Sequence, residues 1–157
     1  MISSLAEKFF LGAFLFILFS ASCRLSVISQ PATVSTANGT GPIYEISAGR
    51  SWQGTGIRLR SGETIQIQFI SGEIQDGEAV IRGSTGAGWA CDDKDCCEPM
   101  PFEQRDALIG RVGDNFFLIG DQNEIPSPAD GELQLRINDC DAGLFDNSGS
   151  FKIRISH

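Results

Sequence analysis

A short stretch near the end of the chain is rich in residues that bind metal ions. Between Asn138 and Phe151 the sequence reads NDCDAGLFDNSGSF, with three aspartates, two asparagines and two glycines between two strand-like segments. Ca²⁺ takes about six to eight oxygen ligands and accepts a mixture of carboxylates, side-chain amides and backbone carbonyls. We therefore expect a loop wrapped around a hard cation rather than a tight hairpin.

Several positions in this stretch can supply oxygens to one ion. Asp139, Asp146 and Asn147 offer side-chain oxygens from the two ends of the loop. Gly143, in the middle, can turn its backbone carbonyl inward. An EF-hand is excluded, because strands flank the loop and Ser150 stands at the twelfth position from Asp139, where that motif has glutamate. A polar Asn/Asp/Gly loop without metal remains open on composition alone.

The elements that must hold this loop are strands. From Ile43 onward apolar and polar residues alternate with a period of two, and no helical period occurs. The predicted strands cover 43–46, 57–60, 64–70, 79–81, 107–112, 116–119, 133–137 and 151–155, with a turn around 52–56. The fifth and sixth are densely apolar, which predicts burial on both faces. Seven or eight short strands separated by turn residues predict an all-β, antiparallel sandwich.

The segment before Ile43 is predicted to lie outside this domain. Residues 1–22 have the organisation of a signal peptide, with a polar start, an apolar run over 9–19 and small residues at 20–22. Cys23 follows as in a bacterial lipobox, so the protein is either lipidated there or secreted with Cys23 near its new terminus. Residues 23–42 are typical of a flexible tether, and 43–157 form the domain. The expected location is an outer-membrane or cell-surface lipoprotein, or a secreted or periplasmic protein.

Four cysteines remain in the exported part, namely Cys91, Cys96, Cys97 and Cys140. An oxidising compartment makes two disulfides the simplest use of an even set. A bridge between the neighbours Cys96 and Cys97 is strained. This leaves Cys91–Cys96 with Cys97–Cys140, or Cys91–Cys97 with Cys96–Cys140, each worth ~2–4 kcal/mol per bridge. A zinc site is disfavoured by the spacing and by the lack of a nearby histidine.

Trp89 stands just before the cysteine-rich loop, after a glycine-rich segment. It has two interpretations: a side chain that fills the core, or an exposed platform on which a ligand stacks. Of the two, we expect burial in the core.

Other functions have less support. A net charge of −8 with a pI near 4.5 disfavours binding to nucleic acid, which is a polyanion. The only histidine, His157, is the last residue, which disfavours a Ser-His-Asp or Cys-His site. No glycine-rich phosphate loop lies between a strand and a helix. Paired carboxylates keep a glycosidase as a weak alternative, and we expect that the protein is not an enzyme.

The stretch 138–151, together with ALIGRVGD at 107–114 and FFLIG at 116–120, resembles the calcium-dependent bacterial galactophilic (PA-I-type) lectin family. The resemblance implies a jelly-roll-like, galactose-binding-domain-like sandwich over about residues 43–156. It also implies the calcium ligands, which would be Asp139, the carbonyl of Gly143, Asp146, Asn147 and a carbonyl near Asp76. In such lectins the ion also takes two sugar hydroxyls, and Asp139 and Asp146 would accept hydrogen bonds from them.

Two departures from that family concern the sugar. Asp146 stands where the galactose binders carry asparagine, and the histidine of their middle loop has no counterpart here. Galactose specificity therefore does not transfer. We expect an exported, calcium-dependent carbohydrate-binding protein, with membrane contact only through a lipid anchor and with oligomerisation left open. The alternative is a non-catalytic surface or adhesion module in which calcium and disulfides only make the loops rigid.

Overall fold

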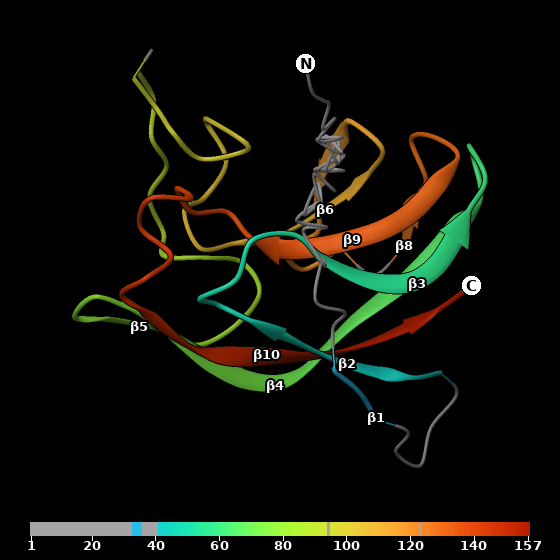
Figure 1. The fold of residues 1–157 in the computed structure, drawn as a ribbon, viewed down its shortest axis with the longest axis horizontal. Coiled ribbons are helices and arrows are strands. Elements are labelled where there is room, and N and C mark those ends of the chain that lie inside the picture. Colours follow the sequence, from blue (N-terminus) through green and yellow to red (C-terminus); the bar gives the residue numbers. More distant parts are fainter. Residues whose placement is uncertain (1–32, 36–40, 94, 123) are drawn as a thin grey trace, which may run out of the picture.

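The computed structural model of the 157-residue chain describes residues 33–35, 41–93, 95–122 and 124–157. The predicted signal peptide, Cys23 and most of the predicted tether lie outside the described residues. Two antiparallel sheets face each other as a sandwich (Figure 1). In the described parts of the chain there is no helix, and hence none that is long and apolar enough to cross a membrane.

One sheet has six strands, with the last strand of the sequence in its interior. Its order is β1 (Thr33–Ser35), β2 (Ile43–Ser47), β10 (Asn147–Ser156), β4 (Thr64–Asp76) and β5 (Ala79–Ile81). A further strand, β8 (Glu124–Pro126), pairs with the beginning of β4. β10 lies between β2 and β4, and so connects the amino-terminal strands β1 and β2 to the rest of the sheet.

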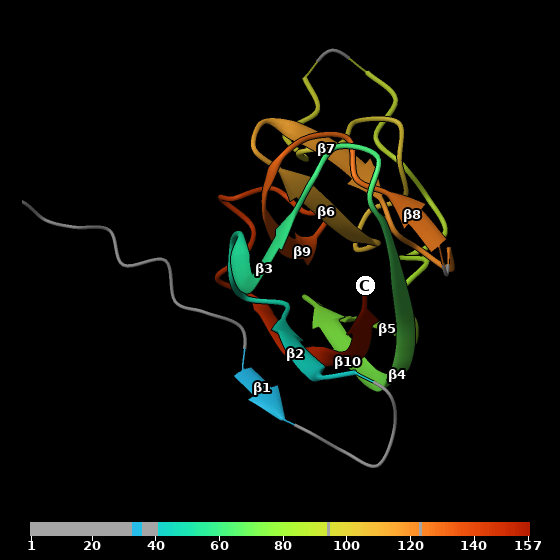
Figure 2. The ribbon, with the colours of Figure 1, turned by 90° about the vertical axis from the view of Figure 1, so that its right-hand side faces the viewer.

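The second sheet has four strands and covers the first, as the two layers in Figure 2 show. Its order is β3 (Gln53–Leu59), β9 (Gly131–Ile137), β6 (Leu108–Val112) and β7 (Asn115–Leu118). Alternate residues of both sheets point inward and exclude water between the layers. The fully buried apolar side chains include Ile46, Ile65, Leu108, Leu133, Leu135, Ile137, Phe151, Ile153 and Ile155.

The predicted antiparallel sandwich is confirmed, and each of the eight predicted strands is present. Two details of the prediction are wrong, and two strands lie outside the predicted set. The predicted turn at 52–56 belongs largely to β3, which begins at Gln53. The pairing of β3 with β9 shifts register between Gly54 and Arg58. β7 is an edge strand and is not buried on both faces; Phe116 on it is 43% exposed and stacks on Trp52 with ring centroids 5.4 Å apart. β8 was not predicted, and Thr33–Ser35 of the predicted tether form β1.

Three connections meet at one end of the sandwich, on the left of Figure 1. They are the tight turn between β4 and β5, the long segment 82–107 between β5 and β6, and the segment 138–146 between β9 and β10. Cross-links between them are covalent and ionic: Cys97 is bonded to Cys140, and Arg105 pairs with Asp76. The loop that was singled out in the sequence is therefore held against two other segments.

Candidate metal centre

Three aspartates from the three connections come together at this end. Asp76 is the last residue of β4, Asp106 lies two residues before β6, and Asp139 lies two residues after β9. One carboxylate oxygen from each lies within 4.8 Å of the others. Three like charges at this separation repel strongly unless a cation or a proton lies among them.

Asp139 is the most firmly held of the three. Its side chain is fully buried and accepts hydrogen bonds from the Cys140 N–H (2.7 Å) and the Asn147 Nδ2 (2.8 Å). Gly143 leaves room for it, since a Cβ there would lie 3.2 Å from Asp139 Oδ2. The loop thus shapes a small polar cradle around this carboxylate.

Asp106 was not predicted from the sequence. Its backbone lies in the left-handed region (φ 61°), and its N–H donates to the Asn138 carbonyl at 3.0 Å. The side chain is 1% exposed, and within the described residues no donor reaches either oxygen of its carboxylate. Burial, followed by repulsion from Asp76 and Asp139, raises the pKa of Asp106 to about 7 against the opposing effect of Arg105. A proton held there makes a hydrogen bond with the Asp76 carboxyl, which also raises this pKa.

Arg105 supplies the cationic side chain that pairs with this cluster. Its Nε lies 3.0 Å from Asp76 Oδ2, and its Nη2 lies 3.0 Å from Asp139 Oδ1. The guanidinium carbon also lies 5.2 Å from the centroid of the Trp89 ring. In the metal-free protein the guanidinium therefore partly neutralises the negative charge of the cluster.

The backbone around the cluster is fixed by two buried polar side chains. Asn138 joins the 97–104 segment to the end of β9, accepting from the Met100 N–H and donating to the Met100 carbonyl, both at 3.0 Å. Arg136 donates to the carbonyls of Ile137 (3.0 Å) and Asp139 (2.6 Å). Its Nη1 also pairs with Asp141. These contacts hold the cradle independently of any ion.

The two disulfides are Cys91–Cys96 and Cys97–Cys140. This is the first of the two pairings that the sequence allowed. Cys140 directly follows Asp139, so the bridge ties the segment 138–146 covalently to the segment that carries Trp89 and Arg105.

Most of the predicted ligand positions are brought together. Asp139, Gly143 and Asn147 form one group, and Asp76 lies opposite Asn147 in the β4–β10 pairing. At Asp76 the carboxylate, rather than the expected carbonyl, faces the cluster. Asp146 differs, because its side chain is exposed and has no hydrogen bond or ion pair with the described members of the group. Only its backbone contacts the group: the Asp146 N–H donates to the Gly143 carbonyl at 3.3 Å.

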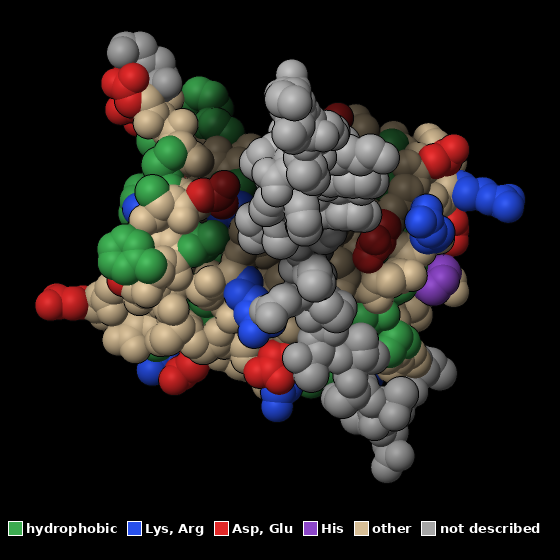
Figure 3. All heavy atoms as spheres, viewed as in Figure 1, with side chains coloured by type: hydrophobic (Ala, Val, Ile, Leu, Met, Phe, Trp, Pro, Cys, Tyr) green, Lys and Arg blue, Asp and Glu red, His purple; other side chains and the backbone are tan. Residues whose placement is uncertain are grey.

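Exposed aromatic side chains surround this end of the sandwich. Trp89 is 50% exposed, so its expected burial in the core is wrong. Phe102, in the same connection, is 70% exposed, and Phe145, in the segment 138–146, is 87% exposed. Figure 3 shows hydrophobic and acidic side chains gathered together over these loops. Exposed aromatics beside a polar site are typical of ligand-binding surfaces.

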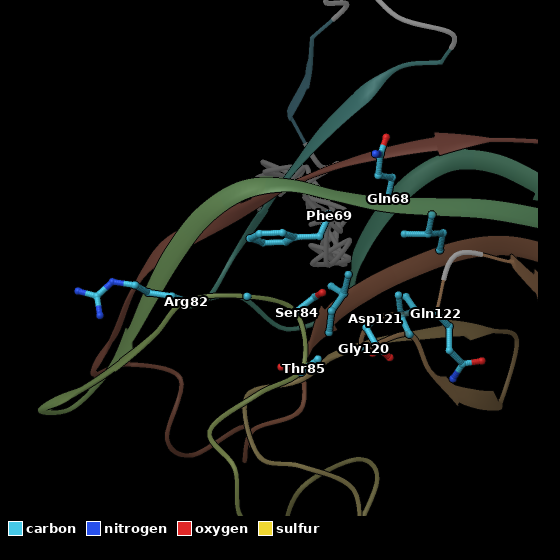
Figure 4. A pocket seen from close by; sticks show the side chains of 12 residues that line it. Gln68, Phe69, Arg82, Ser84, Thr85, Gly120, Asp121 and Gln122 are labelled. Carbon is cyan, nitrogen blue, oxygen red and sulfur yellow. The ribbon is translucent and has the colours of Figure 1, made fainter.

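A separate cavity of about 420 Å³ opens between β4 and the segments 82–85 and 119–122. Ile67, Phe69, Leu108 and Ile119 form its apolar wall. Figure 4 shows Arg82 and Gln122 extending away from it on opposite sides. It contains none of the three clustered aspartates and is distinct from the candidate metal centre.

Comparisons with known proteins identify the fold. No protein-family model matches the chain, and no curated protein matches it. A solved structure described as "EclA N-terminal domain; PllA-like lectin" superposes with a TM-score of 0.55 at 24% sequence identity, covering 72% of this chain and 92% of that one. At this level of identity the likeness establishes the fold alone. The chain therefore has a lectin-like antiparallel β-sandwich, as the sequence predicted.

Proposed function

We propose that this protein is a lectin-like module that binds calcium at the end of the sandwich and uses the ion to bind carbohydrate. The observation that carries the calcium proposal is the buried carboxylate of Asp106, which has no described donor and lies within 4.8 Å of two other carboxylates. Burying a charged group without a partner is costly, so such an arrangement favours a cation.

The donor set suits calcium. Asp76, Asp106 and Asp139 offer carboxylate oxygens, Asn147 offers an Oδ1 that has no described hydrogen-bond partner, and the Gly143 carbonyl lies in the same loop. All are hard oxygen donors, and irregular sets of this kind are typical of Ca²⁺ rather than of zinc or copper. An ion bound there would also accept neighbouring hydroxyl groups of a sugar as ligands.

The carbohydrate part of the proposal has its own support. The solved structure that shares the fold is described as a lectin. Beside the acidic cluster, Trp89 and Phe145 present aromatic surface to solvent, and the apolar face of a sugar ring stacks well on such side chains. Export, lipidation at Cys23 and the absence of enzymatic activity remain predictions from the sequence.

A second candidate is a surface module in which calcium only makes the loops rigid. The Cys97–Cys140 bridge and the buried Asn138–Met100 contact favour it, because they bind the segment 82–107 to the segment 138–146. The two candidates share the calcium site and differ in whether a sugar binds.

Calorimetric titration of the chelator-treated protein with CaCl₂ tests the metal site. We expect binding by the wild type, loss of binding in Asp139→Ala, and unchanged binding in Asp114→Asn, which removes an exposed carboxylate on the β6–β7 turn. A ligand that binds only the folded state also stabilises it, by about 2.7 kcal/mol at a hundred times its Kd. No heat at millimolar calcium in the wild type contradicts the proposal.

A glycan array, probed with calcium and again with chelator, tests the carbohydrate part. Signal that disappears with chelator supports a calcium-bridged sugar. Calcium binding without any glycan signal favours the second candidate. Glycan signal that persists in chelator shows that the sugar binds away from the ion, which rejects the first candidate.

A further inference from the structure

The Arg105 side chain lies at the point where a divalent cation would have to bind. Its Nε and Nη2 are each 3.0 Å from a carboxylate oxygen, one on Asp76 and one on Asp139. Each of these two carboxylates also has an oxygen within 4.8 Å of an oxygen of the third carboxylate, that of Asp106. A guanidinium placed in this way partly neutralises the cluster, as a metal ion would.

The backbone of Arg105 is fixed while its side chain is not enclosed. The Arg105 N–H donates to the Trp89 carbonyl at 2.9 Å, and the Arg105 carbonyl accepts from the Ala87 N–H at 2.8 Å. The side chain is 24% exposed, and its guanidinium already lies over the half-exposed Trp89 ring. The guanidinium can therefore leave the carboxylates without any change in the main chain.

Loss of the guanidinium does not leave Asp139 without partners. The Cys140 N–H and the Asn147 amide continue to donate to its two oxygens. The cradle is thus preorganised whether or not Arg105 occupies it. By contrast, a guanidinium and a divalent ion sharing the same oxygens repel each other in a partly buried site.

We propose that Arg105 is a tethered counter-cation which competes with the metal ion for Asp76 and Asp139. When the ion binds, the guanidinium moves from the carboxylates toward Trp89 and solvent, beside the surface where the ligand binds. This inference rests on the proposed calcium site. Arg105 then lowers the affinity of the site for calcium, and its movement couples calcium binding to the environment of Trp89.

Calcium affinity is the first test. In Arg105→Gln, calorimetric titration should give a Kd at least about tenfold lower than in the wild type, because the competing charge is absent. Arg105→Lys keeps the charge and should remain within a few-fold of the wild type. Arg82→Gln removes an exposed arginine that pairs with Glu73, and is the matched control with an unchanged Kd. An equal or weaker affinity in Arg105→Gln overturns the inference.

Fluorescence of Trp89 is the second test, and it compares proteins with and without the Arg105 side chain. The chain has two tryptophans, so Trp52→Phe leaves Trp89 as the reporter. Calcium should shift its emission in this background and leave it unshifted when Arg105→Gln is added. Calcium binding without a shift means that the guanidinium stays in place, which rejects the inference while the calcium site survives. Absence of calcium binding in both the wild type and Arg105→Gln rejects the site itself.

Discussion

Asn147 and Asp76 lie directly opposite each other in the pairing of β10 with β4. The Asn147 amide donates to Asp139 at 2.8 Å, while Asp76 faces the same carboxylate through Arg105. The two residues are 71 positions apart in the sequence, and only the register of the sheet brings them together. The position of the metal centre therefore depends on this register as much as on the loop that was recognised in the sequence.

Asn147→Asp should have opposite effects with and without calcium. Without the ion, the new carboxylate replaces a hydrogen bond to Asp139 by repulsion, and we expect a loss of about 1–3 kcal/mol. With saturating calcium the added charge strengthens coordination, so the increase in Tm on adding calcium should exceed that of the wild type. Melting curves in chelator and in calcium check both signs, and an unchanged calcium-induced shift contradicts the placement of Asn147 at the ion.

Asp106 should make the stability of the metal-free protein depend on pH. Its pKa rises from an ordinary 3.8 to about 7 on folding. Between these values the folded protein holds a proton that the unfolded chain releases, so the free energy of unfolding falls as pH rises and levels off above about pH 7. The contribution of this group is present in full below about pH 4.

Asp106→Asn should remove that dependence, because an amide does not ionise. In chelator at pH 8 the variant should melt above the wild type, and at pH 4 the two should coincide. Calcium at pH 8 should reverse the order, since the wild type gains a ligand that the variant lacks. Parallel melting curves of the two proteins across pH 4–8 in chelator argue against an ionising buried Asp106.

The two disulfides should differ in their effect on the metal centre. Replacing Cys97 and Cys140 together by serine frees the loop next to Asp139, and we expect a loss of about 2–4 kcal/mol together with weaker calcium binding. The bridge between Cys91 and Cys96 closes only a short loop, so the corresponding double serine variant is a matched control with a smaller loss of stability. Calorimetry and chemical denaturation of the two variants compare them.

Trp89 should contribute to ligand binding and little to stability. Because half of the side chain is exposed, Trp89→Ala should change the free energy of unfolding by less than about 1 kcal/mol. It should weaken binding to any glycan identified on the array by about tenfold, while Trp89→Phe keeps part of the stacking. Equal glycan affinity in all three proteins removes Trp89 from the binding surface.

Much of the fold was predictable because alternation of apolar and polar residues reports directly on strands with one buried face. Phe151 and Ile153 are buried, and Lys152 between them is exposed, as the period requires. β8 escaped prediction because it has three residues, one of them Pro126. The position of β7 at an edge is a property of sheet order, which the local pattern does not contain.

The candidate site was predictable only where its residues are neighbours in the sequence. Asp139, Gly143 and Asn147 lie close together in sequence, so their composition alone signals a cation site. Asp106 stands singly before a strand, and its place in the cluster follows from packing between the two sheets and from a left-handed backbone. The sole local hint was an acidic residue next to Arg105 at the start of the apolar run 107–112.

The interior position of β10 has a consequence for biosynthesis. β2 and β4 both pair with this strand, although β2 ends at Ser47, β4 ends at Asp76 and β10 begins only at Asn147. Until it emerges from the ribosome, the six-stranded sheet lacks the strand that joins its two sides, and β2 and β4 have unpaired edges. The Asn147 end of the metal centre arrives equally late. The six-stranded sheet can therefore complete its pairing only after β10 has been made, and the folding of this sheet depends on contacts between residues far apart in the sequence.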